Sequence, residues 1–162
     1  MKSRLPAIDG WFTDEAEPRL IASRGTQTGS YFFPKSLAFS RNPSAPDEEL
    51  DETTLSRTGR VWSWTTNHYQ PPAPYVSPDP FVPYTVVAVE LVDEQMVVLG
   101  PLAAGDDPAD LAVGAPVELT IGTLYADDEH EYTMWAWRMT GAANPTVDQL
   151  DRDDGVRHER IG

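Results

Sequence analysis

The chain contains no cysteine, and this absence removes several classes of function at once. Disulfide bonds, thiolate nucleophiles and zinc sites built from cysteine are all excluded. Positive charge is scarce as well, because 12 Lys and Arg stand against 26 Asp and Glu, which gives a net charge of −14. Phosphate backbones are bound mainly through Lys and Arg. We therefore expect no nucleic acid as a partner of this chain.

Long hydrophobic runs are also missing from the sequence. No stretch approaches the roughly 18 apolar residues that a membrane-spanning helix needs. The first residues, Met1 to Pro6, lack the apolar run of a secretory leader. We therefore expect a cytoplasmic protein with no membrane partner. The length of 162 residues fits one domain that can bury a sizeable core.

The sequence is organised around the stretch from Leu55 to Glu90. Aromatic and β-branched residues cluster in its first half, which predicts a strand. Strict alternation places Trp62, Trp64 and His68 on one face of this strand. A loop from Gln70 to Pro83 follows, and it carries six of the fifteen prolines. Such a loop is stiff and cannot join a central sheet ladder, and loops of this length are often functional.

The rest of the chain predicts an all-β fold. Four further runs rich in apolar and β-branched residues indicate strands at Tyr84–Val92, Met96–Leu102, Val117–Tyr125 and Tyr132–Met139. One helical turn is predicted at Asp106–Leu111, where aspartates precede a proline. Five strands with a helical turn between the third and the fourth fit a five-stranded Greek-key barrel of the OB type over residues 55–140.

The two ends of the chain are predicted to lie outside this barrel. Residues 1–18 form a peripheral segment, in which Trp11 and Phe12 are expected to pack under the main body in preference to contacting another chain. Residues 141–162 form a charged C-terminal tail with one short helix at Val147–Leu150. We expect this tail to be mobile or to be draped on a partner.

Residues 19–54 are predicted to form a small hairpin followed by an acidic linker. The hairpin has its apex at Gly25–Gly29, between two short strands. The linker includes Asp47–Glu52, which carries five carboxylates in six residues. Calcium loops space their ligands at alternate positions around a glycine, and that pattern is missing. We therefore expect a solvated charge run rather than a metal site.

Five short motifs follow one another along the chain. They are Arg24 with Gly29, Phe33 and Pro34; Gly59 to Thr65; His68 before the proline-rich loop; Pro83 to Leu91; and Val113 to Val117. In this order they resemble the family named domain of unknown function 35, over Pro18 to Met139. Members of that family pair a small rubredoxin-like zinc ribbon with an OB fold, so the resemblance implies the barrel that the strand pattern also predicts.

The resemblance also implies a zinc site that this chain has lost. Typical members carry two Cys-x-x-Cys knuckles, which fall on Gly25 and Thr28 and near Phe39 and Asn42. None of these residues binds zinc as a thiolate does, so we expect a degenerate, metal-free, zinc-ribbon-like hairpin. Another source of stability must then replace the metal. We expect apolar residues of the hairpin to pack against the barrel or a partner, namely Tyr31, Phe32, Phe33, Leu37 and Phe39.

What the resemblance implies about function is a partner enzyme. Proteins of this family are usually small subunits of thiolase-like enzymes, including aldolases related to sterol carrier protein type thiolases that cleave steroid side-chain CoA thioesters by a retro-aldol reaction. The larger subunit holds the catalytic residues. We therefore expect a non-catalytic accessory subunit of an aldolase or acyltransferase, in a complex with two copies of each chain. No cofactor is expected to bind this chain tightly, and acyl-CoA is the substrate of the complex.

The aromatic residues supply the candidate contact site. Two tryptophans on each of two strands, Trp62 with Trp64 and Trp135 with Trp137, exceed what a small barrel interior holds. At least one pair is therefore predicted to face outward, where it could anchor a partner. The candidates for contact with the partner or with acyl-CoA are Trp62, Trp64, His68, Tyr69, Tyr75 and Phe81.

Two other functions are alternatives to the partner subunit. An OB-fold protein can bind single-stranded nucleic acid by stacking bases on aromatic side chains, but this needs a positive groove. Only Arg57, Arg60 and Arg138 lie near the tryptophan-bearing strands. A stand-alone hydrolase needs an activated nucleophile, and Ser63 and His68 are predicted on opposite faces of one strand. We predict no catalytic residue in this chain.

Overall fold

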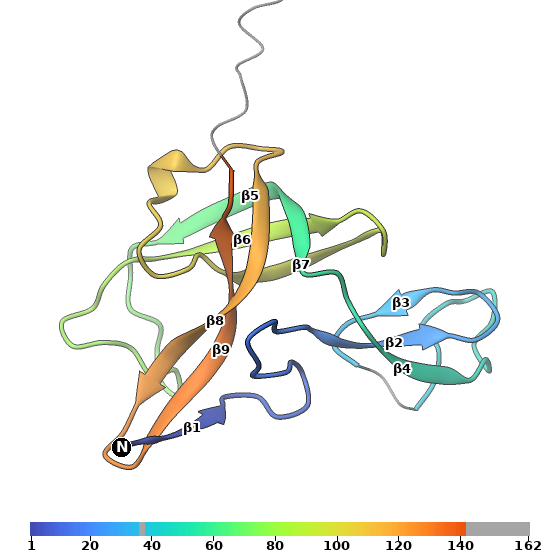
Figure 1. Cartoon of the computed structure of the whole chain (residues 1–162), viewed down its shortest axis with the longest axis horizontal. Helices are drawn as coiled ribbons and strands as arrows, with labels where there is room; N and C mark the ends of the chain where they lie inside the picture. The colour runs from blue at the N-terminus through green and yellow to red at the C-terminus, as the bar shows by residue number, and fades with distance from the viewer. Residues whose placement is uncertain (36–37, 142–162) are drawn as a thin grey trace, which may run out of the picture.

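A computed structural model gives the fold of the chain, and it describes residues 1–35 and 38–141. The described chain is almost entirely β, as predicted, with one short 3₁₀ turn. Figure 1 shows a curled six-stranded sheet and a small three-stranded sheet beside it. Among the described residues, no helix is both long and apolar enough to cross a bilayer. The predicted charged tail and its short helix lie, from residue 142 onward, outside the described residues.

Five strands build the barrel in the predicted order, and the predicted OB architecture is confirmed. They are β5 (Thr58–Asn67), β6 (Tyr84–Leu91), β7 (Met96–Pro101), β8 (Pro116–Ala126) and β9 (His130–Met139). β5 pairs antiparallel with both β6 and β8, β7 pairs with β6, and β9 pairs with β8. A single parallel bridge between Leu102 and Trp137 connects the end of β7 to β9 and brings the two sides of the curled sheet together.

The helical turn predicted between the third and the fourth barrel strands is η1 (Pro108–Asp110). Asp107 caps this turn, because its Oδ1 accepts a hydrogen bond from the N–H of Ala109 at 2.9 Å. Pro108 is tolerated at the first position, where an N–H would have no partner in the turn. Asp106 Oδ2 accepts a hydrogen bond from the N–H of Met139 at 2.8 Å, which fixes the turn to the end of β9.

β6 supplies the centre of the core, as its apolar run predicts. Val87, Val89 and Leu91 have no exposed surface. β9 contributes Trp135 and Trp137 to the same core, and Trp137 is the largest side chain that is fully buried. Aromatic side chains remove more apolar surface from water than any others, so these two indoles dominate the packing of the barrel.

The N-terminal residues extend the barrel sheet, although residues 1–18 are predicted to be peripheral. β1 (Ser3–Pro6) pairs in parallel with β9, and the N–H of Ser3 donates to the carbonyl of Glu129 at 3.1 Å. Its sequence includes a charged residue and a proline and has no alternating pattern. Only its pairing with β9 makes it a strand, and a local pattern could not predict this.

The packing of Trp11 and Phe12 under the main body is confirmed. Phe12 is buried and forms an isolated bridge with Leu20. Trp11 stacks on Trp135, with 6.0 Å between the ring centroids. The segment that connects β1 to the small sheet therefore covers the tryptophan-rich end of the barrel core.

The small sheet has three strands, one more than the predicted hairpin. β2 (Ile21–Gly25) pairs antiparallel with β3 (Tyr31–Phe32), as predicted, and also with β4 (Leu50–Thr54). β4 lies in the segment that is predicted to be an acidic linker. Aspartate and glutamate are depleted in strands, so the composition of β4 concealed it.

Aromatic residues join the small sheet to the barrel, and two of the five residues expected to pack in this way, Phe33 and Tyr31, do so. The ring centroid of Phe33 lies 5.7 Å from that of Trp11 and 5.7 Å from that of Trp135, edge to face in both cases. Tyr31 also packs against the core. Of the other residues expected to pack in this way, Phe32 is half-buried, Phe39 is exposed and Leu37 is not among the described residues.

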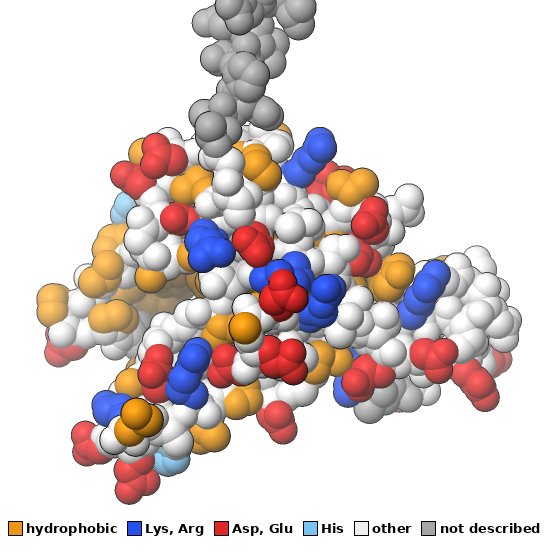
Figure 2. Space-filling view, viewed as in Figure 1, with side chains coloured by type: hydrophobic (Ala, Val, Ile, Leu, Met, Phe, Trp, Pro, Cys, Tyr) orange, Lys and Arg blue, Asp and Glu red, His pale blue; other side chains and the backbone are white. Residues whose placement is uncertain are grey.

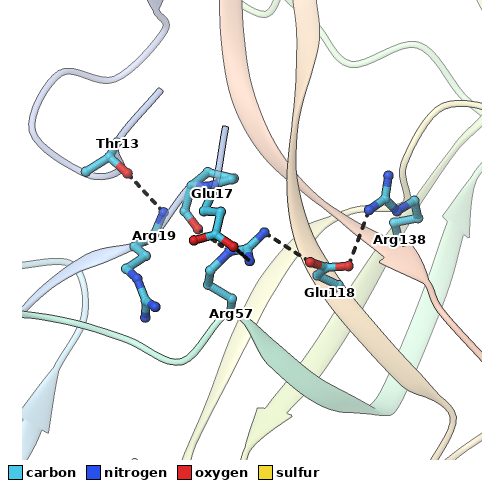
Figure 3. A network of polar contacts seen from close by, with 7 residues as sticks. Thr13, Glu17, Arg19, Arg57, Glu118 and Arg138 are labelled. Atoms are coloured by element: carbon cyan, nitrogen blue, oxygen red, sulfur yellow. Dashed lines mark hydrogen bonds and ion pairs between the residues drawn. The ribbon is translucent and has the colours of Figure 1, made fainter. Parts of the chain in front are cut away.

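A polar network holds the N-terminal segment against the barrel (Figure 3). Arg57, just before β5, donates from Nε to the carbonyl of Pro18 and from Nη2 to Glu118 Oε1, both at 3.0 Å. The other carboxylate oxygen of Glu118 lies 3.3 Å from Nη2 of Arg138 on β9. Because the planar guanidinium can hold two acceptors in a fixed geometry, Arg57 connects the N-terminal segment to β8.

Candidate functional site

β5 contains a bulge at its tryptophans, and the bulge changes which residues share a face. Val61 pairs with Val89, whereas Trp64, three residues further on, pairs with Val87, only two residues away on β6. Trp62 is therefore at the extra position in the strand. Opposite residues of antiparallel strands share a face, so Trp64 lies on the side of the buried Val87. The strict alternation predicted for this strand is wrong at the bulge.

The two tryptophan pairs lie in different environments. Trp62 is 60% exposed and Trp64 is 37% exposed, whereas Trp135 is 4% exposed and Trp137 is fully buried. One pair is exposed and lies outside the packed core, as predicted, and it is the pair on β5. Its two members do not share one face, because the bulge puts Trp64 on the side of Val87. A barrel core that already holds two indoles has no room for two more.

The proline-rich loop continues this exposed surface beyond the end of β5. Tyr69 and Tyr75 are 71% and 73% exposed. Phe81 is half-buried and packs edge to face with Tyr84, with 6.4 Å between the ring centroids. We call the exposed apolar residues of β5, of this loop and of the first position of β6 the aromatic loop surface: Trp62, Trp64, Tyr69, Tyr75, Val76, Val82 and Tyr84.

A hollow separates the proline-rich loop from the β8–β9 hairpin, and hydrophobic side chains gather along the loop (Figure 2). β5 and β8 pair only from Thr58 to Arg60 against Pro116 to Glu118. β5 continues toward Asn67 from one end of this short ladder and β8 continues toward Ala126 from the other, so the two strands run apart (Figure 1). In OB barrels the loop after the first strand and the loop between the fourth and the fifth flank the usual binding face. The aromatic loop surface therefore lies at the binding side of the fold.

The hairpin on the far side of the hollow ends in an acidic turn. Asp127 Oδ1 accepts hydrogen bonds from the N–H groups of His130 and Glu129, at 2.6 and 2.9 Å. These two bonds, of which that from His130 has the larger effect, hold the pKa of Asp127 below its ordinary value. Asp128 and Glu129 add further negative charge. A phosphate chain would be repelled by this side of the hollow.

The arginines near the tryptophan-bearing strands offer little positive charge to a ligand. Arg57 and Arg138 both form ion pairs with Glu118. Arg60 is exposed, and it pairs in the ladder with Glu90 on β6. The site therefore lacks the positive groove that stacking of single-stranded nucleic acid needs.

His68 lies just past the end of β5, exposed, where the proline-rich loop begins. Ser63 is five residues earlier in the strand and is exposed as well. A general base activates a hydroxyl only within hydrogen-bond reach and usually in a partly desolvated site. His68 and Ser63, both among the described residues, are exposed, and no hydrogen bond between them is seen. That this surface is non-catalytic remains a prediction.

Of the four positions where the family resemblance implies zinc ligands, three lie in one cluster and the fourth, Phe39, does not. Phe39 is 64% exposed, and its neighbour Ser40, which is 4% exposed, takes the inward place. Glu48, 5% exposed, lies at the centre of the resulting polar cluster, so the charge run that we predict to be solvated is not solvated at this residue. Nothing in the sequence marks Glu48 among its acidic neighbours. The positions that do join the cluster are Gly25, Thr28 and Asn42.

Comparison with known proteins agrees with this geometry. Residues 52–122 match the family model described as ChsH2, C-terminal OB-fold domain. Among solved structures, a chain of one described as "Ltp2-ChsH2(DUF35) aldolase" is similar, with a TM-score of 0.55 and 25% sequence identity. The similarity covers 75% of this chain and 84% of that chain. No curated protein sequence matches the chain.

The two matches and the described structure agree with the resemblance that the sequence motifs indicate. The family model spans β4 to the middle of β8, and the structural similarity extends over most of the chain. The chain has an OB-fold barrel similar to the C-terminal OB-fold domain of ChsH2, and most of the chain is similar to a chain of the Ltp2-ChsH2(DUF35) aldolase.

Proposed function

We propose that this chain is a non-catalytic accessory subunit of a thiolase-like aldolase or acyltransferase that acts on acyl-CoA thioesters. The observation that carries the proposal is the similarity to the solved Ltp2-ChsH2(DUF35) aldolase, whose description joins two components in one enzyme. A chain that resembles one component over most of its length is suited to the same kind of partner.

The aromatic loop surface supports a protein partner. Tryptophan and tyrosine are the residues that most often anchor protein interfaces. Exposed apolar residues that gather on one surface of a soluble protein mark an interaction site. The loop between Tyr69 and Tyr84 is rich in proline, so its aromatic side chains are held with little freedom to lose on binding.

In this proposal the partner holds the reacting groups, and this chain shapes the site beside them. The stiff loop and the tryptophans of β5 would cover the acyl-CoA or the partner segment that binds it. We extend the proposal to the substrate class, CoA thioesters of steroid side chains cleaved by a retro-aldol reaction, and to a complex with two copies of each chain. The reaction is supported by the similar structure, which is an aldolase.

The test is co-expression with the thiolase-like protein encoded nearest to this chain, followed by size-exclusion chromatography with light scattering. We expect a stable mixed complex, and cleavage of acyl-CoA that needs both chains. A monomer that binds none of the thiolase-like candidates would contradict the proposal. Binding of a single-stranded oligonucleotide that weakens with salt would favour the OB-fold nucleic-acid binder instead.

Two exposed valines, one inside the aromatic loop surface and one outside it, provide a mutational test of where the interface lies. Val76 in the aromatic loop surface is 63% exposed, and Val113, between η1 and β8, is 70% exposed. A buried, unpaired charge is costly in an interface and costs little in water. We therefore expect Val76→Asp to weaken the complex by about a hundredfold or more, and Val113→Asp to leave it intact. Equal loss from both substitutions would argue against the aromatic loop surface as the interface.

A further inference from the structure

The small sheet does not fit the zinc ion that its family resemblance implies. The expected ligand positions carry glycine, threonine, phenylalanine and asparagine, none of which supplies a thiolate or an imidazole. Within residues 1–35 and 38–141, no three His, Cys, Asp or Glu side chains are grouped to hold a metal ion. Structural zinc sites need four such ligands.

A carboxylate occupies the place of the first expected ligand. A Cβ atom built on Gly25 would lie 2.3 to 2.5 Å from the carboxylate atoms of Glu48. Any side chain at position 25, including a cysteine, would therefore require the Glu48 carboxylate to move from this place. Glycine at this position and glutamate at position 48 are complementary in shape.

Each carboxylate oxygen of Glu48 accepts two hydrogen bonds. Oε2 accepts from the backbone N–H groups of Gln27 and Thr28, at 3.1 and 2.9 Å. Oε1 accepts from the hydroxyls of Thr28 and Ser40, both at 2.8 Å. The donors belong to two segments, the turn after β2 and the loop that leads to β4. Hydrogen bonds to an ionised acceptor are about twice as strong as neutral ones.

A second layer of contacts connects the same two segments. The N–H of Asn42 donates to Ser40 Oγ at 3.1 Å, and Asn42 Nδ2 donates to Ser30 Oγ at 2.9 Å. Ser30 Oγ in turn lies 2.9 Å from Thr28 Oγ1. The cluster therefore closes on itself around the Glu48 carboxylate.

We propose that the Glu48 carboxylate replaces a structural metal ion in this chain, joining the two turns that zinc would join, so that the small sheet folds without metal. A metal ion is bound by atoms that offer lone pairs, whereas an ionised carboxylate is bound by groups that donate hydrogen bonds. The surrounding positions accordingly present hydroxyl and N–H donors instead of thiolates. This inference is independent of the function proposed above.

Glu48 is in this role a positioning residue for the barrel as well. The cluster fixes the turn between β2 and β3, and the chain directly after β3 places Phe33 against Trp11 and Trp135. Loss of the carboxylate should therefore release the small sheet first and loosen the tryptophan cluster only as a consequence.

The test combines metal analysis with hydrogen exchange on the full chain. We expect no stoichiometric zinc, and no change in the unfolding midpoint on adding zinc or a chelator. We expect Glu48→Ala to speed amide exchange in β2–β4 by at least about tenfold, with a smaller effect in β8 and β9. Glu48→Gln retains one oxygen acceptor but loses the charge, so its effect should lie between those of wild type and Glu48→Ala.

Glu49→Ala is the matched control, because it removes the same charge from the exposed neighbouring residue. It should leave exchange in the small sheet unchanged. If Glu48→Ala does not fold, Ser40→Ala, which removes one of the four donors, must still speed exchange in the small sheet. Stoichiometric zinc, a midpoint lowered by the chelator, or equal exchange in the Glu48 and Glu49 variants would overturn the proposal.

Discussion

A Cβ atom added to Gly100 would lie 2.9 Å from Nε1 of Trp137 and 2.8 Å from Nε1 of Trp135. The backbone of β7 therefore packs directly on the two buried indoles of β9. Trp135 Nε1 also donates a hydrogen bond to the carbonyl of Leu99 at 3.0 Å. The closed side of the barrel has no space for even a methyl group between these two strands.

We expect Gly100→Ala to destabilise the chain by about 1–3 kcal/mol, the usual cost of an extra group in a packed core. The free energy of unfolding from denaturant titration measures this. Gly122→Ala on β8 is the control, because no atom lies within 4 Å of a Cβ at that position. Its effect should stay within about 0.5 kcal/mol. Equal destabilisation by the two substitutions would show that the indoles do not confine Gly100.

Phe33 provides a test of the contact between the small sheet and the barrel. Its ring meets Trp11 and Trp135 edge to face, and it is half-buried. We expect Phe33→Ala to cost about 3 kcal/mol, the lower end of the range for a core phenylalanine. Near-ultraviolet circular dichroism should report the altered tryptophan environment.

Tyr69→Ala is the matched aromatic control for Phe33→Ala, because Tyr69 is exposed on the proline-rich loop. Its effect on the free energy of unfolding should stay within about 0.5 kcal/mol. If Phe33→Ala were equally harmless, the small sheet would be attached to the barrel by other contacts.

Glu48 should make part of the stability of the small sheet dependent on pH. The N–H of Thr28 has the largest effect in holding the pKa of Glu48 below its ordinary value of 4.5; burial opposes it, and the other donors add to it. A carboxyl group whose pKa is lower in the folded state stabilises that state above its ordinary pKa. Its contribution is lost as the pH falls through the lowered pKa.

Wild type and Glu48→Gln should therefore differ most at neutral pH, and the difference should shrink as the pH falls below 4.5. Unfolding midpoints in denaturant, measured for both proteins across this range, give the comparison. The other carboxyl groups, Asp127 included, are common to both proteins, so their titration cancels in the difference. A difference that is the same at every pH would mean that the charge of Glu48 contributes nothing.

The barrel could be predicted from the sequence because each of its strands carries its own signal. β6, for example, is mostly apolar, with Val86 to Val89 as an unbroken apolar run, and Asp107 with Pro108 marks the start of η1. β1 and β4 carry no such signal, since one contains a charge and a proline and the other is acidic. Their pairing partners lie far away in the sequence, which local patterns do not report.

The candidate site could be predicted only in part. The tryptophans and the proline-rich loop stand out by composition, and the excess of indoles correctly indicates that one pair lies outside the core. The bulge in β5 could not be predicted, because it depends on the register with β6. The role of Glu48 could not be predicted either. It depends on two segments, the turn after β2 and the loop before β4, which meet around one carboxylate that resembles its neighbours in sequence.

The position of β1 has a consequence for the behaviour of many copies of this chain together. β1 lies along β9 from Ser3 to Pro6, opposite His130 to Thr133. An uncovered β9 would present a row of unpaired N–H and C=O groups to any neighbouring molecule, which is how sheets join edge to edge and aggregate. β1 therefore covers the edge of β9 and protects it from pairing with another molecule. A chain shortened by its first six residues would expose this edge, and we expect it to self-associate there.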